Sequence, residues 1–311
     1  MKRTLLSLLL AACSLPAIAQ SLHIEAEKSA GGTRVTFVAD RKEYPGTTTV
    51  YFTLKDLSNC KNGMTGTEKM EIAHEGQRVK MLNAANESRG VGYSYGYYCY
   101  NCRIDTKIDG NAVYRMPCTT RRPIRVHSTV YVYDKHVHPD EEHKQLGYRF
   151  QLEKGDTVYC ARRGRVVKIE RPEPSQFERG TVSFSTETVN ITIEHPDGSE
   201  AWYICVDPES LMVEPGDDVM PGDPLALAGT YDYENYNVSL QIYRYVTDPS
   251  KPGHTAQHPG ISHRQLFPRF ATTEGDVTLE HGKSYTAVMN DRLYTHDMSK
   301  KERKRFAGNK R

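Results

Sequence analysis

The chain has almost no segment with helical periodicity, and it has no strong excess of charge of either sign. Its 41 Lys and Arg residues nearly balance 39 Asp and Glu, which leaves a formal net charge of +2. A charge this close to zero argues against a protein that wraps around nucleic acid. The apolar run at the N-terminus is too short to span a bilayer, and no other segment is apolar enough to do so.

The N-terminus has the pattern of an export signal. Lys2 and Arg3 precede the short apolar run TLLSLLLAA, and the small-x-small triplet AIA ends at Ala19. This pattern predicts a signal peptide over 1–19 and a mature protein in the periplasm or cell envelope. The run LAAC, which ends at Cys13, resembles a bacterial lipoprotein box, so a lipid anchor at Cys13 is the alternative and the only membrane attachment expected.

Export changes what the cysteines predict. Six remain once the leader is removed: Cys60, Cys99, Cys102, Cys118, Cys160 and Cys205. An even number in an oxidising compartment is typical of disulfides. The motif CYNC occurs once, lacks the strand-to-helix setting of a redox motif, and has no second Cys-x-x-Cys to complete a zinc ribbon. Structural bridges and plain buried thiols are therefore both left open.

Strand patterns recur along the whole chain, among them TRVTFVAD, TTVYFTL, STVYVYD, RVVKIE and VNITIEH, with turn residues between them. They predict an all-β protein. The inside-outside alternation near the N-terminus predicts an immunoglobulin-like β-sandwich there. After the signal peptide, the predicted parts are a sandwich over 20–117, a connecting segment over 118–147, an antiparallel β-domain with a groove over 148–245, a loop and hairpin extension over 246–297, and a basic, disordered tail over 298–311.

Several phrases in the second half of the chain occur in a familiar order and spacing. EKGDTVYCARRGRVVKIE forms a hairpin pattern, VNITIEHPDGSEAWYICV a strand pair, and VEPGDDVMPGDPLALAG a Gly-punctuated run, followed by NVSLQIYRY. Together they cover roughly a third of the chain. They resemble the lysostaphin/LytM-type zinc endopeptidases, which cut peptide cross-links in peptidoglycan. The resemblance implies that family's antiparallel β-domain for residues 148–245.

The resemblance also implies a ligand set, which this chain departs from. The family holds a catalytic zinc with a His and an Asp before the first hairpin and with the second His of His-x-His. Here the Asp position is Arg149, and the His-x-His positions are Ser239 and Gln241. A guanidinium offers no lone pair to a metal. The catalytic His of Tyr-x-His becomes Cys205, which follows Tyr203 by two residues.

The first His ligand is the least certain position. Simple spacing places it at Gln145, although His143, His138 and His136 lie close by, and His143 is the candidate for a surviving ligand. A catalytic zinc needs three protein ligands, and one surviving imidazole does not hold it. No zinc and no other cofactor is therefore expected.

Other chemistries have weaker signals. Cys205 as a nucleophile needs a nearby base, and His195 is the candidate. A Cys160–Cys205 bridge is a further alternative if their strands are neighbours. The loop HTAQHPGISH holds His254, His258 and His263, but its Gly and Pro content favours a solvated loop over a metal site.

The resulting hypothesis is an exported pseudopeptidase of the cell envelope. It binds peptidoglycan or regulates a cell-wall hydrolase, and the groove candidates are Arg149, Tyr203, Cys205, Ser239 and Gln241. The first alternative is an active zinc endopeptidase with relocated ligands from 136–143 and the 254–263 loop. A purely structural envelope protein is the second alternative.

The mature protein is expected to begin near Gln20, because the cleavage triplet AIA follows a charged start and a short apolar run. Intact mass and N-terminal sequencing of the native protein measure this. A lipidated N-terminal Cys13 would favour the alternative, and a native protein that retains Met1 would contradict export.

Overall fold

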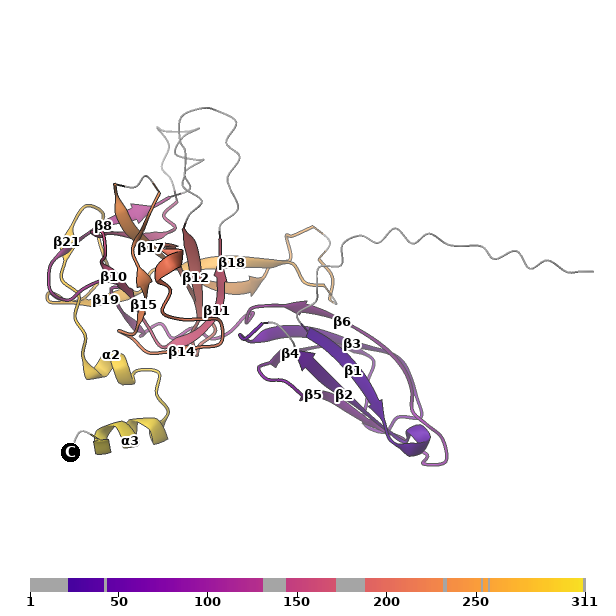
Figure 1. Cartoon of the computed structure of the whole chain (residues 1–311). Helices are drawn as coiled ribbons and strands as arrows, with labels where there is room; N and C mark the ends of the chain where they lie inside the picture. Colours follow the sequence, from indigo (N-terminus) through magenta and orange to yellow (C-terminus); the bar gives the residue numbers. More distant parts are fainter. Residues whose placement is uncertain are drawn as a thin grey trace, which may run out of the picture.

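The computed structural model describes residues 22–41, 44–130, 144–171, 188–231, 234–252, 254–256 and 258–309, so the predicted signal peptide and Cys13 lie outside the described residues. The fold is all-β, as the sequence predicts, and it has two lobes (Figure 1). The strands of the N-terminal lobe are β1 (Leu22–Lys28), β2 (Arg34–Arg41), β3 (Thr48–Ser58), β4 (Gly66–Ile72), β5 (Gln77–Asn83) and β6 (Gly92–Tyr100), with a 3-10 turn, η1, at Ala30–Gly32.

The N-terminal lobe is a sandwich of two antiparallel sheets. Their strand orders are β1-β2-β5 and β4-β3-β6. These are the orders A-B-E and C′-C-F of an immunoglobulin-like sandwich. The two inner faces meet where Phe37 of β2 packs edge-on against Phe52 of β3, with ring centroids 5.0 Å apart. The alternation that predicted the sandwich is therefore the alternation that fills its core.

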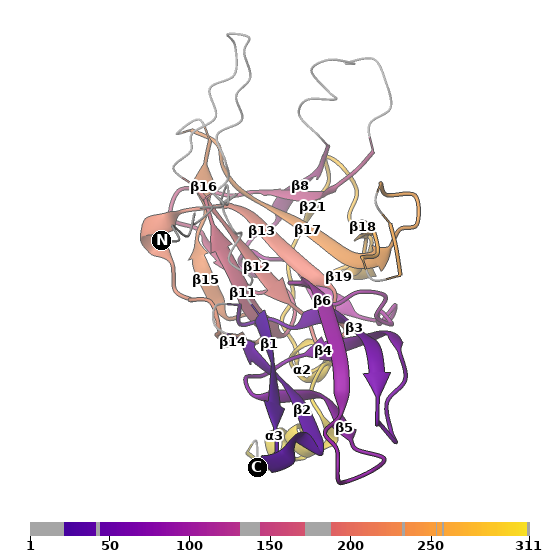
Figure 2. The same cartoon turned by 90° about the vertical axis from the view of Figure 1, so that its right-hand side faces the viewer.

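The larger lobe is built on one long sheet with the strand path β14-β11-β12-β13-β17-β9-β8-β21, and β16 and β18 also pair with β17. Figure 2 shows this sheet above the N-terminal sandwich. Its strands are β8 (Ile124–Thr129), β9 (Gly147–Gln151), β11 (Gly164–Glu170), β12 (Val189–Glu194), β13 (Glu200–Val206), β14 (Asp218–Val219), β16 (Gly229–Thr230), β17 (Tyr236–Thr247), β18 (Ile261–Leu266) and β21 (Ser284–Tyr285).

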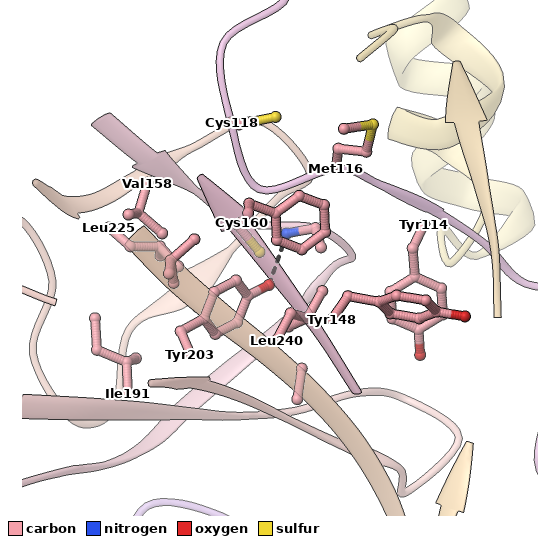
Figure 3. Close-up of a cluster of buried hydrophobic side chains, with 14 of the residues drawn as sticks. Tyr114, Met116, Cys118, Tyr148, Val158, Cys160, Ile191, Tyr203, Leu225 and Leu240 are labelled. Atoms are coloured by element: carbon pink, nitrogen blue, oxygen red, sulfur yellow. Dashed lines mark hydrogen bonds between the residues drawn. The ribbon is translucent and has the colours of Figure 1, made fainter. Parts of the chain in front are cut away.

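Two small sheets pack against one face of the long sheet. One pairs β10 (Thr157–Tyr159) with β15 (Pro224–Leu227), and the other has the order β20-β19-β7, from Gly275–Val277, Arg269–Thr272 and Val113–Arg115. A 3-10 turn, η2 (Pro208–Ser210), precedes β14. Figure 3 shows the core between the layers, where Tyr203, Leu240 and Leu225 lie close together. Burying such side chains contributes roughly 1.5–3 kcal/mol each.

The larger lobe extends beyond the predicted limits of 148–245. Tyr114 and Met116 upstream, and Phe270 and Tyr285 downstream, belong to its main buried cluster. β8 lies inside the predicted connecting segment 118–147, yet it pairs with β9 and belongs to the sheet. The lobe extends upstream because β7 pairs in parallel with β19, which lies far along the chain. A local sequence pattern does not reveal such a pairing.

The six cysteines are free thiols in the structure. Burial raises the pKa of Cys160 to about 12. Cys160 lies just after β10 and Cys205 on β13, and these two strands do not pair. The Cys160–Cys205 bridge is therefore not formed. Of the two alternatives the structure has free thiols, four of them buried, while Cys60 and Cys99 are half-buried.

The basic tail was predicted to be disordered, and this was wrong. Residues Lys300–Asn309 form helix α3, after a short helix α2 at Asp291–Thr295. Glu302 accepts a hydrogen bond from Arg163 at 2.7 Å, and Phe306 stacks on Tyr294 with centroids 5.3 Å apart. Glu302 and Phe306 thus fix one face of α3 to the protein. None of the helices in the described residues has the length and apolar character needed to cross a bilayer.

A buried ion-pair network holds the C-terminal segment on the larger lobe. The Arg162 guanidinium donates to both carboxylate oxygens of Asp297, at 2.9 and 2.8 Å, and to Asp197 at 2.9 Å. The side chains of Arg162, Asp197 and Asp297 are 3%, 8% and 8% exposed. The Arg162 charge also holds the pKa of Asp197 below its usual range, although burial alone would raise it.

Asp297→Asn should lower the free energy of unfolding by about 3 kcal/mol, because it leaves the Arg162 charge with one fewer buried partner. Urea denaturation measures this. The matched control is Asp218→Asn, which removes an exposed partner of Arg165 and should change stability by less than about 1 kcal/mol. Equal effects of the two substitutions would show that the buried network contributes no special stability.

Candidate functional site

The candidate site lies on the face of the long sheet opposite the core, and its geometry follows from strand β17. Val238, Leu240 and Ile242 of β17 are in the core cluster, so Ser239 and Gln241 lie on the other face. We call this other face of β8, β9, β17 and β13 the outer sheet face. The connections between β8 and β9 and between β11 and β12 include residues outside the described ranges.

The structure brings three of the predicted residues together. Ser239 pairs directly with Arg149 on β9 and with Ile204 on β13. Gln241 lies two residues further along β17, opposite Trp202. Residues directly opposite each other in neighbouring strands have Cβ atoms about 4.5–5.5 Å apart. Arg149, Ser239 and Gln241 therefore form one continuous patch.

Cys205 reaches the same face through an irregularity in β13. The pairing of β12 with β13 shifts by one residue, because Val189 pairs with Val206 but Ile191 with Tyr203. Tyr203 and Val206 are both in the core cluster, which places the two residues between them away from it. Cys205 has a φ of 72°, in the left-handed region, and its side chain is fully buried.

Tyr203 was predicted to line the groove, and the structure corrects this. Tyr203 pairs with Leu240, so both side chains point into the core. Its hydroxyl accepts a hydrogen bond from the Ala161 backbone N–H at 2.7 Å (Figure 3). Tyr203 is a structural residue, and its neighbour Trp202 takes its place on the outer sheet face.

Aromatic residues that the sequence analysis missed lie next to this patch. Trp202 packs edge-on against Tyr243, with ring centroids 5.0 Å apart. Tyr243 in turn packs edge-on against His263, with ring centroids 4.8 Å apart. The Tyr243 hydroxyl donates to the Gln241 side-chain oxygen. The alternation of β17 beyond Gln241 would have pointed to Tyr243, and the cross-strand register alone points to Trp202.

A buried carboxyl group borders the aromatic residues. Glu200 is 4% exposed and accepts hydrogen bonds from Tyr245 at 2.9 Å and from the Trp202 indole at 3.2 Å. Burial raises the pKa of Glu200 to about 7. Tyr245 is bridged to Ile104 of the N-terminal half, so Glu200 lies near the junction of the two lobes.

The outer sheet face carries positive charge at its centre. Arg149 is exposed and lies opposite His127 of β8. Burial and the Arg149 guanidinium both lower the pKa of His127, so its imidazole is neutral near pH 7. No ion pair of Arg149 with another described residue is formed.

The residues present do not fit a catalytic zinc. Arg149 has no lone pair to donate, and Gln241 and Ser239 offer only neutral oxygens. In the described ranges, no three His, Cys, Asp or Glu side chains gather as a metal site. His136, His138 and His143, on which the relocated-ligand alternative depends, lie outside the described residues.

The other predicted chemistries involve residues that lie apart. His195 is at one end of the β12–β13 hairpin and Cys205 near the other, so they do not form a nucleophile–base pair. His258 packs on Tyr98 of the sandwich, with ring centroids 4.6 Å apart, whereas His263 contacts Tyr243. His254 accepts a hydrogen bond from the Gly260 N–H within its own loop.

Comparisons with known proteins give structural likenesses only. No protein-family model matches the chain, and no curated protein matches it significantly. A protein described as a glycyl-glycine endopeptidase LytM from Ruminococcus gnavus shares 18% identity over 46% of this chain, with a TM-score of 0.27, and the match spans 57% of that protein.

Two longer matches are also found. Csd3 of Helicobacter pylori shares 8% identity over 92% of this chain and 83% of its own, with a TM-score of 0.31. A zinc-containing peptidase from Vibrio cholerae shares 12% identity over 76% of this chain and 83% of its own, with a TM-score of 0.32. At such low identities and TM-scores, these likenesses assign no activity to this chain.

Glu200→Gln should remove a pH dependence of stability. The pKa of Glu200 is raised from 4.5 to about 7 in the folded protein, so the native state favours the protonated form and loses stability as pH rises across that window. The variant should show a flatter profile and higher stability than the wild type at pH 8. Urea denaturation between pH 4 and 8 measures both, with the exposed Glu214→Gln as control. A wild-type profile retained in Glu200→Gln would contradict the assignment.

Proposed function

We propose that this chain is an exported, non-catalytic protein of the cell envelope that binds peptidoglycan through its outer sheet face. The observation that carries the proposal is the position of Arg149. It lies opposite Ser239, at the place where the resembled peptidases have two of their working residues. A fixed positive charge there opposes zinc and favours an anionic group of a ligand.

The charge and shape of the face support a peptide ligand. Stem peptides of peptidoglycan carry carboxylates, and Arg donates to a carboxylate through a planar fork of N–H groups. Arg149 is exposed, so its guanidinium is available to a ligand that lies along β9 and β17. Gln241 adds an amide group beside it.

The aromatic residues support contact with the apolar parts of the same ligand. Trp202 is half-buried, and its ring is held by Tyr243 and by the indole hydrogen bond to Glu200. An aromatic side chain held in this way contributes contact area with little loss of conformational entropy on binding. The patch therefore combines one cation, one amide and one aromatic surface.

The protein should take up no stoichiometric zinc, and single restorations should not change this. Arg149→Asp alone or Gln241→His alone leaves fewer than the three ligands that a catalytic zinc needs. Elemental analysis after zinc loading and dialysis measures the metal, and release of muropeptides from purified cell wall measures activity. One equivalent of zinc with chelator-sensitive cleavage in the wild type would support the relocated-ligand peptidase instead.

The wild type should co-sediment with purified peptidoglycan, and Arg149→Glu should bind at least about tenfold more weakly, because a charge reversal replaces attraction of a carboxylate by repulsion. Trp202→Ala should also weaken binding. The control is Arg78→Glu, which makes the same charge change on an exposed position of β5. Binding that Arg149→Glu leaves intact would contradict the proposed face. No binding by the wild type would favour contact with a cell-wall hydrolase or a structural role.

A further inference from the structure

Arg115, at the end of β7, is a buried cation with only neutral partners. It is 4% exposed, and its guanidinium donates to the backbone oxygens of Met116 at 2.7 Å and Cys118 at 2.8 Å. Its Nε–H has no hydrogen-bond partner in the described part of the chain. None of the ion pairs between described residues includes Arg115.

The neutral partners of Arg115 do not fully offset the free-energy cost of burying its charge. Burial lowers the pKa of Arg115, but an Arg side chain remains protonated in proteins. The face of the Tyr159 ring, with its centroid 4.5 Å from the guanidinium carbon, attracts the cation. Carbonyl dipoles and a ring face offset only part of the cost of removing a full charge from water. An anion would complete the site.

Arg115 lines a cavity of about 430 Å³ whose other walls suit an anion. Thr119 and Arg121 come from the loop after β7, and Thr157 and Tyr159 from β10. Thr157 and Tyr159 each bring a hydroxyl group to the lining of this cavity. Such a volume is typical of sites for small ligands.

Two further features of the wall bear on its shape and charge. Gly222 forms part of the wall with a φ of +93°, a conformation that favours glycine, and a Cβ there would lie 3.9 Å from Arg115 Nε. The one carboxylate in the wall, Asp156, is paired with Arg122, which offsets its charge. Arg121 is exposed at the same cavity and has no ion-pair partner among the described residues.

We infer that this cavity, here called the Arg115 cavity, binds an oxyanion, either a carboxylate or a phosphate group. Arg115 supplies the buried counter-charge, Arg121 a second cation at the exposed side, and the Thr157 and Tyr159 hydroxyls supply hydrogen bonds. Because β7 and β10 belong to the small sheets across the core, this site is separate from the outer sheet face. Its test is therefore independent of the test of peptidoglycan binding.

The experiment is isothermal titration calorimetry of the full-length protein with potassium phosphate and, in a second arm, sodium acetate, both in a chloride buffer of matched ionic strength. The wild type should bind at least one of the two anions with one site per chain. A preference for phosphate indicates a phosphorylated ligand, and a preference for acetate indicates a carboxylate such as a peptide terminus. Heat no greater than that of chloride dilution in both arms would overturn the inference.

Substitutions locate the site. Arg121→Ala is an exposed change that should weaken binding about fivefold, because an exposed ion pair contributes up to about 1 kcal/mol. Thr157→Val, which keeps the side-chain shape, should also weaken binding. The control Arg34→Ala, an exposed position of β2, should bind as the wild type does.

Arg115→Met should abolish binding while retaining the volume of the side chain. If Arg115 serves only to brace the loop through Met116 and Cys118, this variant loses stability but Arg121→Ala and Thr157→Val bind normally, which overturns the inference. If Arg115→Met does not fold, Arg121→Ala and Thr157→Val alone decide the outcome, since neither change is buried in the core.

Discussion

The larger lobe depends on the two-residue alternation of strand β17. This strand pairs with β13, β9, β16 and β18, so its register sets the position of four neighbours. Val238 and Leu240 fill the core, whereas Ser239 and Gln241 lie on the opposite face. A slip of one residue would exchange the two sets and bury polar groups without partners. The free-energy cost of burying these polar groups therefore fixes the register of β17 against its neighbours.

The same alternation determines which chemistry the outer sheet face can offer. Because Ser239 is in register with Arg149, a guanidinium occupies the centre of the face. Because Gln241 is in register with Trp202, an amide and an aromatic ring lie together beside it. A cation, an amide and an indole are suited to recognising a peptide, and they are unsuited to holding a metal ion. The proposed function follows from these neighbours rather than from any one residue.

Polar contacts join the remaining parts to this sheet. The end of β17 bridges to Ile104, and the Thr47 N–H and hydroxyl both donate to Glu194 of β12, at 2.7 and 2.6 Å. On the other side, Arg162 holds Asp297 and with it the C-terminal helices. The Thr47–Glu194 contact is partly buried and the Arg162–Asp297 pair is buried, so both satisfy polar groups that are removed from water in part or in full. The lobes and the tail are thus fixed by hydrogen bonds and ion pairs as well as by apolar packing.

The sequence by itself determined the all-β class and the alternation of the strands, because side-chain periodicity is a local property. The resemblance of its phrases to the zinc endopeptidases pointed to Arg149, Ser239 and Gln241 as neighbours, and the strand register places them on one patch. The tertiary structure alone decided what depends on distant pairing. It turned Tyr203 into the core through a cross-strand register, ordered the basic tail as α3 through contacts such as Arg163 with Glu302, and brought β7 beside β19. Contacts between residues far apart in the chain leave no periodic trace in either segment, so no local pattern could have shown them.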